Sequence, residues 1–199
     1  EQGLPSMVDA GFDFYAPQSF EDAADRRLMI GWVGCPDATA ENPTVGRGWQ
    51  CALTVPRELS MRDGKLCQWP AHEIEKLRGE GLRVAAGELV EEPGCLFDAV
   101  VSCEGVKTFE LEIREGVFVR YADGMLTLDM SDEGFGRDQR SVELSELRDL
   151  RVLSDTTLVE IFANGGEAAL TSRIYSPAAS ATKLQAEGEA SMEFYRLAR

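Results

Sequence analysis

Apolar and polar residues alternate with a period of two along several short runs of this chain. In the clearest run, Phe109, Leu111 and Ile113 alternate with charged residues, and residues 126–130 repeat the pattern. Such alternation is typical of a β-strand that has one face in the core and the other in water. Turn sequences such as that at residues 164–166 separate the runs. From about residue 82 onward, the pattern therefore predicts an antiparallel β-sandwich.

The N-terminal third contains four further strand-like runs, at residues 12–15, 28–33, 49–55 and 65–68. Turn signals separate them, and Asp63-Gly64 before the last run is a strong hairpin signal. Pro17 lacks a backbone donor and has a fixed φ, so we expect the first strand to end there. Short strands in this order form one sheet of the size of a single propeller blade.

A short helix is predicted between the two β-rich parts. After Pro70, Ile74 and Leu77 are spaced for one face of a helix, and Gly79 follows as a helix stop. The chain is therefore predicted to be all-β with one short connecting helix. Its predicted parts are residues 1–70 as the first sheet, 71–81 as the helix and linker, and 82–199 as the sandwich.

The chain is acidic, with 35 Asp and Glu against 20 Lys and Arg and a formal net charge of −15. This charge repels phosphate backbones and anionic lipids, so we expect no nucleic-acid or membrane partner. The five cysteines show no C-x-x-C spacing, which predicts neither a disulfide framework nor a metal site. They are Cys35, Cys51, Cys67, Cys95 and Cys103. Reduced thiols are typical of a cytoplasmic protein, which is the expected location.

The stretch from Asp13 to Gln18 places a carboxylate and a phenol on one side of the first strand. Alternation puts Asp13 and Tyr15 on that side, and Phe12 and Phe14 on the other. A carboxylate and a phenol at a strand end are a common way to contact a polar ligand. They are also a common way to end a strand at a solvated rim, and the residues alone leave both interpretations open.

Three segments of the sequence resemble glycoside hydrolase family 32, which includes the β-fructofuranosidases (invertases) and the sucrose-6-phosphate hydrolases. The first is DAGFDFYAPQ at residues 9–18, and the second joins IGW at 30–32 to LTVPREL at 53–59. The third is DTTLVEIFANGGE at residues 155–167. These segments match the C-terminal part of the family in the right order. The resemblance implies that residues 1–70 are the last blade of a five-bladed β-propeller, followed by a C-terminal antiparallel β-sandwich.

The resemblance implies hydrolysis of fructosides with retention of the anomeric configuration. The family uses an aspartate nucleophile, an Arg-Asp-Pro aspartate and the glutamate of a Glu-Cys motif. None of these motifs occurs in this sequence. Its three Arg-Asp pairs, at residues 62, 137 and 148, are never followed by Pro, and Cys103-Glu104 reverses the acid/base motif. The resemblance therefore implies that the complete protein is a glycoside hydrolase that needs no cofactor. It also implies that this chain holds no catalytic residue and is inactive alone.

The resemblance assigns three candidate substrate-binding residues, Tyr15, Trp32 and Asp13. Tyr15 and Trp32 match positions that line the fructose pocket of the family, where an aromatic face packs on the sugar and a phenol donates to its hydroxyls. Asp13 is included because it is expected to share the Tyr15 side of the strand. For Trp32, packing in the core of the blade is the alternative, since Leu28 and Ile30 lie on the same face of its strand.

The leading hypothesis is that the chain is the C-terminal fragment of a β-fructofuranosidase-like hydrolase, whose complete form cleaves sucrose and fructo-oligosaccharides. The alternative is a non-catalytic sandwich module for structural support, dimerisation or carbohydrate binding. A single blade leaves strand edges that its neighbours would cover. We therefore expect the blade to pack against the sandwich through residues 53–66, and the chain to form a homo-oligomer that covers the exposed blade edge.

Overall fold

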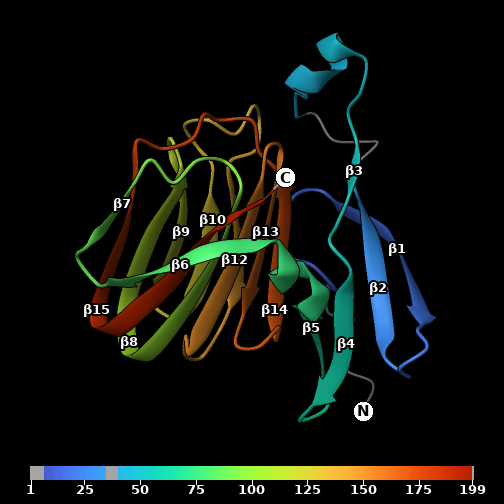
Figure 1. Cartoon of the computed structure of the whole chain (residues 1–199), viewed down its shortest axis with the longest axis horizontal. Helices are drawn as coiled ribbons and strands as arrows, with labels where there is room; N and C mark the ends of the chain where they lie inside the picture. The colour runs from blue at the N-terminus through green and yellow to red at the C-terminus, as the bar shows by residue number, and fades with distance from the viewer. Residues whose placement is uncertain (1–6, 35–39, 199) are drawn as a thin grey trace.

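The computed structural model describes residues 7–34 and 40–198 of the chain. It has two parts that lie side by side, a small sheet from the N-terminal third and a larger sandwich from the rest (Figure 1). Within the described residues, the helices are the short 3₁₀ segments η1 (Pro43–Arg47) and η2 (His72–Leu77). The prediction of an all-β fold, with a blade, a sandwich and one short connecting helix, is confirmed.

The small sheet, called the blade below, has five strands that pair in antiparallel fashion. Their order is β1 (Phe14–Glu21), β2 (Arg27–Val33), β4 (Arg57–Arg62) and β5 (Lys65–Pro70), with β3 (Ala52–Leu53) paired to β2. The hairpin at Asp63-Gly64 is confirmed, because both turn residues have positive φ and join β4 to β5. The strand predicted over 49–55 shortens to β3, and β4 follows as a separate strand that the sequence pattern did not predict.

Pro17 does not end the first strand, so that prediction was wrong. β1 continues through Pro17 to Glu21, with a register shift between Tyr15 and Gln18 and a positive φ of 45° at Ala16. These features describe a β-bulge, which absorbs an extra residue on one strand. Because β1 lies at the edge of the sheet, the missing donor of Pro17 interrupts little of the ladder.

The predicted helix is present as η2, and the chain enters the sandwich directly after it. Strand β6 (Arg78–Ala85) begins where η2 ends, and its glycines therefore lie in a strand instead of stopping a helix. A Cβ atom on Gly81 would lie 2.6 Å from Cε1 of the Tyr195 ring, so glycine allows this close approach. The division into residues 1–70, 71–81 and 82–199 stays a prediction.

The sandwich is built from one folded sheet of ten strands. After β6 they are β7 (Leu89–Glu91), β8 (Phe97–Arg114), β9 (Val117–Ala122), β10 (Met125–Asp129), β11 (Gln139–Glu143), β12 (Asp149–Asp155), β13 (Leu158–Ala163), β14 (Ala168–Arg173) and β15 (Ala181–Leu197). The first half of β8 pairs with β12 and its second half with β9, while β15 pairs with β8 from Phe97 to Leu111. The two long strands therefore pass from one layer to the other.

The bend in these two long strands falls at a pair of glycines. Gly105 and Gly188 have φ values of 62° and 125°, and the β15 register shifts on either side of Gly188. A Cβ atom on Gly188 would lie 2.7 Å from the Cα of Val106, closer than real Cβ atoms come. Glycine is needed here because both the backbone angle and the close approach exclude a side chain.

The main core lies between the two layers of the sandwich. The alternation that predicted this fold is confirmed at Phe109, Leu111 and Ile113, all of which are buried in that core. Strand β13 is buried on both faces: Ile161 faces the core, whereas Phe162 packs on Trp69 of the blade with ring centroids 6.1 Å apart. The blade therefore covers the outer face of the sandwich at β13.

Candidate functional site

Tyr15 and Trp32 form an aromatic pair on one face of the blade. They are direct cross-strand partners between β1 and β2, and their ring centroids lie 6.1 Å apart at an interplanar angle of 69°. Leu53 of β3 is the partner of Trp32 on the other side, so the three side chains form a row across the sheet. Tyr15 is 55% exposed and Trp32 is partly exposed. The structure thus brings together two of the three predicted site residues.

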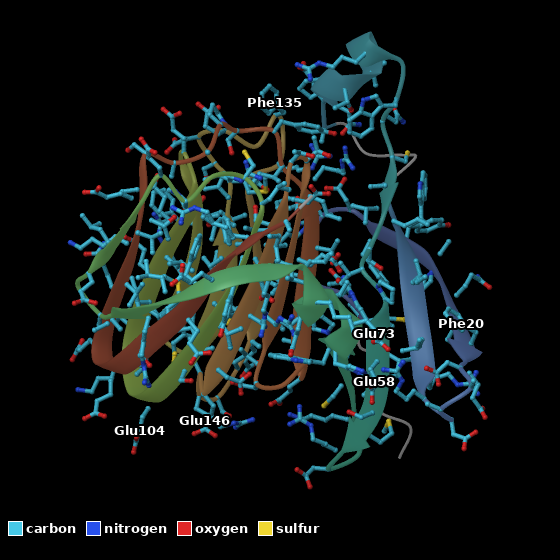
Figure 2. The ribbon with its side chains drawn as sticks, in the orientation of Figure 1. Phe20, Glu58, Glu73, Glu104, Phe135 and Glu146 are labelled. Atoms are coloured by element: carbon cyan, nitrogen blue, oxygen red, sulfur yellow. The ribbon has the colours of Figure 1, made fainter. Side chains whose placement is uncertain are left out.

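The aromatic pair has the chemistry of a sugar-contacting surface. A partly exposed indole offers an apolar face to the C–H groups of a sugar ring, and the Tyr15 phenol can donate to or accept from its hydroxyls. Trp32 is only partly exposed, so packing in the blade stays the alternative for this residue. Phe20, at 46% exposure, extends the apolar surface along the outer edge of the blade, away from the sandwich (Figure 2).

Asp13 does not share this surface, and the expectation that it lies on the Tyr15 side is wrong. Its carboxylate is 2% exposed and forms a two-pronged ion pair with Arg137 of the sandwich, at 2.7 and 2.8 Å. The Arg173 backbone N–H and the Ser172 hydroxyl also donate to it, at 2.8 and 3.2 Å. Asp13 precedes β1 and turns toward these donors, so it joins the blade to the sandwich.

A second buried ionic group joins the two parts around Arg57. This arginine is fully buried and donates to Glu160 of β13, to Asp9, to Gln68 and to Thr171 at distances from 2.5 to 3.0 Å. Burial raises the pKa of Glu160, and the positive charge of Arg57 opposes that shift. Two carboxylates that share one guanidinium, with further hydrogen bonds, satisfy the condition under which a buried charge is tolerated.

The contact predicted through residues 53–66 is confirmed, but it is more polar than the sequence indicated. Val55, Arg57 and Arg62 all hydrogen-bond to the sandwich, whereas Leu53 and Met61 stay exposed. Glu160 supports the fold through this contact, and the sequence patterns above did not predict its ion pair with Arg57. The one signal for this pair is Glu160, a charged residue between Val159 and Ile161 inside a strand.

The described residues contain no group of three or more His, Cys, Asp or Glu side chains that could hold a metal ion. No helix in residues 7–34 or 40–198 is long and apolar enough to cross a membrane. Cys51, Cys67, Cys95 and Cys103 are free thiols, and Cys35 lies outside the described residues. The cytoplasmic location stays a prediction.

Two family models match the chain in the order of its two parts. Residues 2–70 match the glycosyl hydrolases family 32 N-terminal domain, and residues 97–197 match the glycosyl hydrolases family 32 C terminal region. The first match contains the aromatic pair and the second contains Glu160 and Arg137. The ionic groups described above therefore join two regions that the family models treat separately.

Two curated relatives match most of this chain over a part of their own length. A sucrose-6-phosphate hydrolase of Vibrio alginolyticus is 33% identical over 177 residues, which are 84% of this chain and 36% of the relative. A raffinose invertase of Escherichia coli is 36% identical over 193 residues, which are 90% of this chain and 40% of the relative. The chain thus spans well under half the length of the curated relatives it matches.

Solved structures share the arrangement of blade and sandwich. A sucrose-6-phosphate hydrolase from Lactobacillus gasseri superposes with a TM-score of 0.86 at 22% identity, covering 98% of this chain and 43% of that one. A Bombyx mori β-fructofuranosidase, solved as a mutant in complex with sucrose, gives 0.80 at 24% identity and covers 98% of this chain and 42% of that one. These likenesses show the fold. Since the C-terminal model alone matches just over half of its residues, this chain belongs to glycosyl hydrolases family 32.

Proposed function

We propose that this chain is the C-terminal part of a β-fructofuranosidase-like glycoside hydrolase and supplies one wall of its fructose pocket. The aromatic pair of Tyr15 and Trp32 is the single observation that carries the proposal, because it presents a partly exposed indole and an exposed phenol on one face of the blade. The substrates of the complete enzyme are proposed to be terminal fructosides such as sucrose and fructo-oligosaccharides. The names of the matched relatives support this substrate class.

The chemistry itself is assigned to residues outside this chain. Retaining hydrolysis needs two carboxyl groups about 5–5.5 Å apart, one as nucleophile and one as acid/base, with the sugar between them. The buried carboxylates of Asp9, Asp13 and Glu160 are instead held by arginines between blade and sandwich. The motifs that carry the family's catalytic carboxylates do not occur in the sequence. We therefore propose that the chain alone is inactive.

A supporting and self-associating role is a second candidate for the isolated chain. Strand β1 is an edge of the described blade, and its residues Tyr15 and Phe20 expose apolar surface at this edge. An edge strand with exposed apolar residues is a template for pairing with another chain. We propose that the isolated chain forms a homo-oligomer through this edge, and sedimentation of the chain over a range of concentrations tests this candidate.

The pocket proposal is tested by titrating the chain with sugars and following the indole N–H signals of its three tryptophans by NMR. Sucrose and fructose are expected to shift the Trp32 signal, and maltose, which has no fructosyl unit, is expected to leave it unchanged. Trp49 is the internal control, since it is also exposed but stacks on Arg173 instead. Tyr15→Phe is expected to weaken binding about five-fold through the loss of one hydrogen bond. A Trp32 signal that responds equally to maltose, or to no sugar, contradicts the proposal.

A further inference from the structure

We infer that Glu160 of the sandwich is a positioning residue for the aromatic pair of the blade. The inference rests on the proposed function for its consequence, since it concerns the same Tyr15–Trp32 surface. Its structural basis is independent of any sugar: hydrogen bonds and packing contacts connect the Glu160 carboxylate to the residues that immediately precede Trp32 and Tyr15.

The first step is a hydrogen bond that Glu160 accepts from the segment between β3 and β4, where the blade's strand pairing is interrupted. β2 pairs with β3 at Trp32 and Val33, and with β4 at Leu28 and Met29, and the segment between β3 and β4 leaves the ladder. In this break the Val55 backbone N–H donates to Oε1 of Glu160 at 2.7 Å. The Glu160 side chain is only 1% exposed, so this donor is satisfied across the interface and not by water.

The second step is a pair of hydrogen bonds between Thr54 and Gly31. Thr54 precedes Val55, and its hydroxyl accepts from the Gly31 backbone N–H at 3.0 Å while its own N–H donates to the Gly31 carbonyl at 3.0 Å. Thr54 is 5% exposed, so both bonds are sheltered from water. The contact of Val55 with Glu160 therefore restrains the neighbouring Thr54. Thr54 in turn restrains the backbone of Gly31, the residue before Trp32.

The third step leads to the other member of the pair. The second oxygen of Glu160 accepts from Nε and Nη2 of Arg57 at 3.0 and 2.6 Å. The Arg57 guanidinium lies over the ring of Phe14, 5.0 Å from its centroid, which is a cation–π arrangement. Phe14 immediately precedes Tyr15, so the same carboxylate acts on both aromatic residues through their neighbours.

The two routes meet between Phe14 and Gly31. A Cβ atom on Gly31 would lie 2.2 Å from Cε2 of the Phe14 ring, which shows how closely the ring covers this glycine. The residues that precede Tyr15 and Trp32 are thus packed on each other, with Arg57 over the Phe14 ring and Thr54 hydrogen-bonded to Gly31. A sandwich residue is thereby connected to a surface on the opposite side of the blade.

Thr54→Val is the first test, because valine has the shape of threonine and removes only the hydroxyl that accepts from Gly31. We expect the indole N–H signal of Trp32 to shift in the sugar-free chain, and the signal of Trp69 to stay in place. Thr54→Ser keeps a hydroxyl and is expected to restore the Trp32 signal. In the sugar titration, Thr54→Val is expected to bind fructose about five-fold more weakly, the effect of one net hydrogen bond.

Glu160→Gln tests the origin of the effect, since its amide oxygen still accepts from Val55 but no longer carries the charge that holds Arg57. We expect it to shift the ring signals of Tyr15, because Arg57 leads to Phe14 and Tyr15, and to move the Trp32 signal less than Thr54→Val does. If Glu160→Gln does not fold, Glu160→Asp, which keeps the charge but shortens the reach to Val55 and Arg57, is expected to shift the Trp32 signal and replaces it as the test of the carboxylate. A Trp32 signal unchanged by Thr54→Val in the folded, sugar-free chain overturns the inference. A shifted signal with no sugar binding in the parent chain upholds the positioning and contradicts the proposed pocket instead.

Discussion

Asp13 and Arg137 lie 124 positions apart in the sequence and form a buried, two-pronged ion pair between the blade and the sandwich. Nε of Arg137 is 2.7 Å from Oδ2 of Asp13, and Nη2 is 2.8 Å from Oδ1. Asn42 and the Glu41 carbonyl accept further hydrogen bonds from the same guanidinium. Together with the group around Arg57, this pair couples the stability of the blade to the stability of the sandwich.

Asp13→Asn is expected to destabilise the chain by about 3–5 kcal/mol, because it leaves the buried charge of Arg137 without its counter-ion. The free energy of unfolding from urea titration measures the effect. Asp25→Asn is the matched control, since Asp25 is an exposed turn residue with positive φ, a conformation that Asn also tolerates. Its expected cost is within about 0.5 kcal/mol. Equal losses of unfolding free energy in the two variants contradict a stabilising role for the ion pair between Asp13 and Arg137.

The ion pair between Arg26 and Glu73 is expected to make stability depend on pH in the acid range. The Arg26 guanidinium, 2.8 Å from Oε1 of Glu73, lowers the pKa of Glu73 from 4.5 to about 2. Figure 2 shows Glu58 beside Glu73, and Arg26 also lies 3.7 Å from Glu58. A lowered pKa in the folded state means that this stabilisation is present above pH 4.5 and is lost as the pH falls toward 2.

Glu73→Gln is expected to flatten the fall in thermal midpoint between pH 4.5 and 2 without removing it, because Asp22 is also held by Arg26. Thermal unfolding of both proteins at several pH values in this window measures the difference. Glu80→Gln is the control, since Glu80 is exposed and forms no ion pair among the described residues. The same pH profile for wild type and Glu73→Gln contradicts the account of this pair.

Gly188→Ala is expected to destabilise the sandwich at the bend of β15. The new methyl group would meet the Val106 backbone at 2.7 Å and would require a φ of 125°, which alanine rarely adopts. Gly87→Ala is the control, because Gly87 also has positive φ but has no atom within 4 Å of the added Cβ. We expect Gly188→Ala to cost about 1–3 kcal/mol more than Gly87→Ala in urea unfolding, the usual cost of overpacking. A smaller effect at Gly188 than at Gly87 contradicts the proposed bend.

The thiol of Cys103 is expected to react slowly although its side chain is only partly buried. Burial and the negative charge of Asp149 raise the pKa of Cys103 to about 12. At pH 8 roughly one molecule in ten thousand then carries the thiolate, which is the reactive form. Peptide mass spectrometry after iodoacetamide treatment is expected to show little labelling of Cys103 in the native chain and full labelling in urea. Equal native and unfolded rates contradict the prediction.

The features that the sequence predicted correctly are those fixed by local pattern. The alternation at residues 109–113 and the Asp63-Gly64 turn each involve neighbouring residues, so no distant contact changes them. Pro17 shows the limit of such reasoning, since whether a strand can pass a proline depends on whether it is an edge strand. The edge position follows from the assembly of the sheet, which the local sequence does not show.

In the candidate site, too, local sequence predicted some residues correctly, and contacts with distant residues decided the others. Tyr15 and Trp32 were matched from motifs, and the β1–β2 pairing brings them together. Asp13 was misplaced because its orientation is determined by Arg137, which lies far away in the sequence. The role of Arg57 was missed for the same reason, since a strand pattern shows an arginine as an outward residue and does not show the carboxylates that bury it.

The central claim is that this chain supplies a wall of a fructose pocket while the catalytic carboxylates lie outside it. Sucrose hydrolysis by the purified 199-residue chain tests this most directly. The assay is run beside the same chain joined to the upstream sequence of its gene and beside a full-length family 32 enzyme. We predict no turnover by the chain alone and turnover by the full-length enzyme. Sucrose hydrolysis by the chain alone, retained after repurification, contradicts the account.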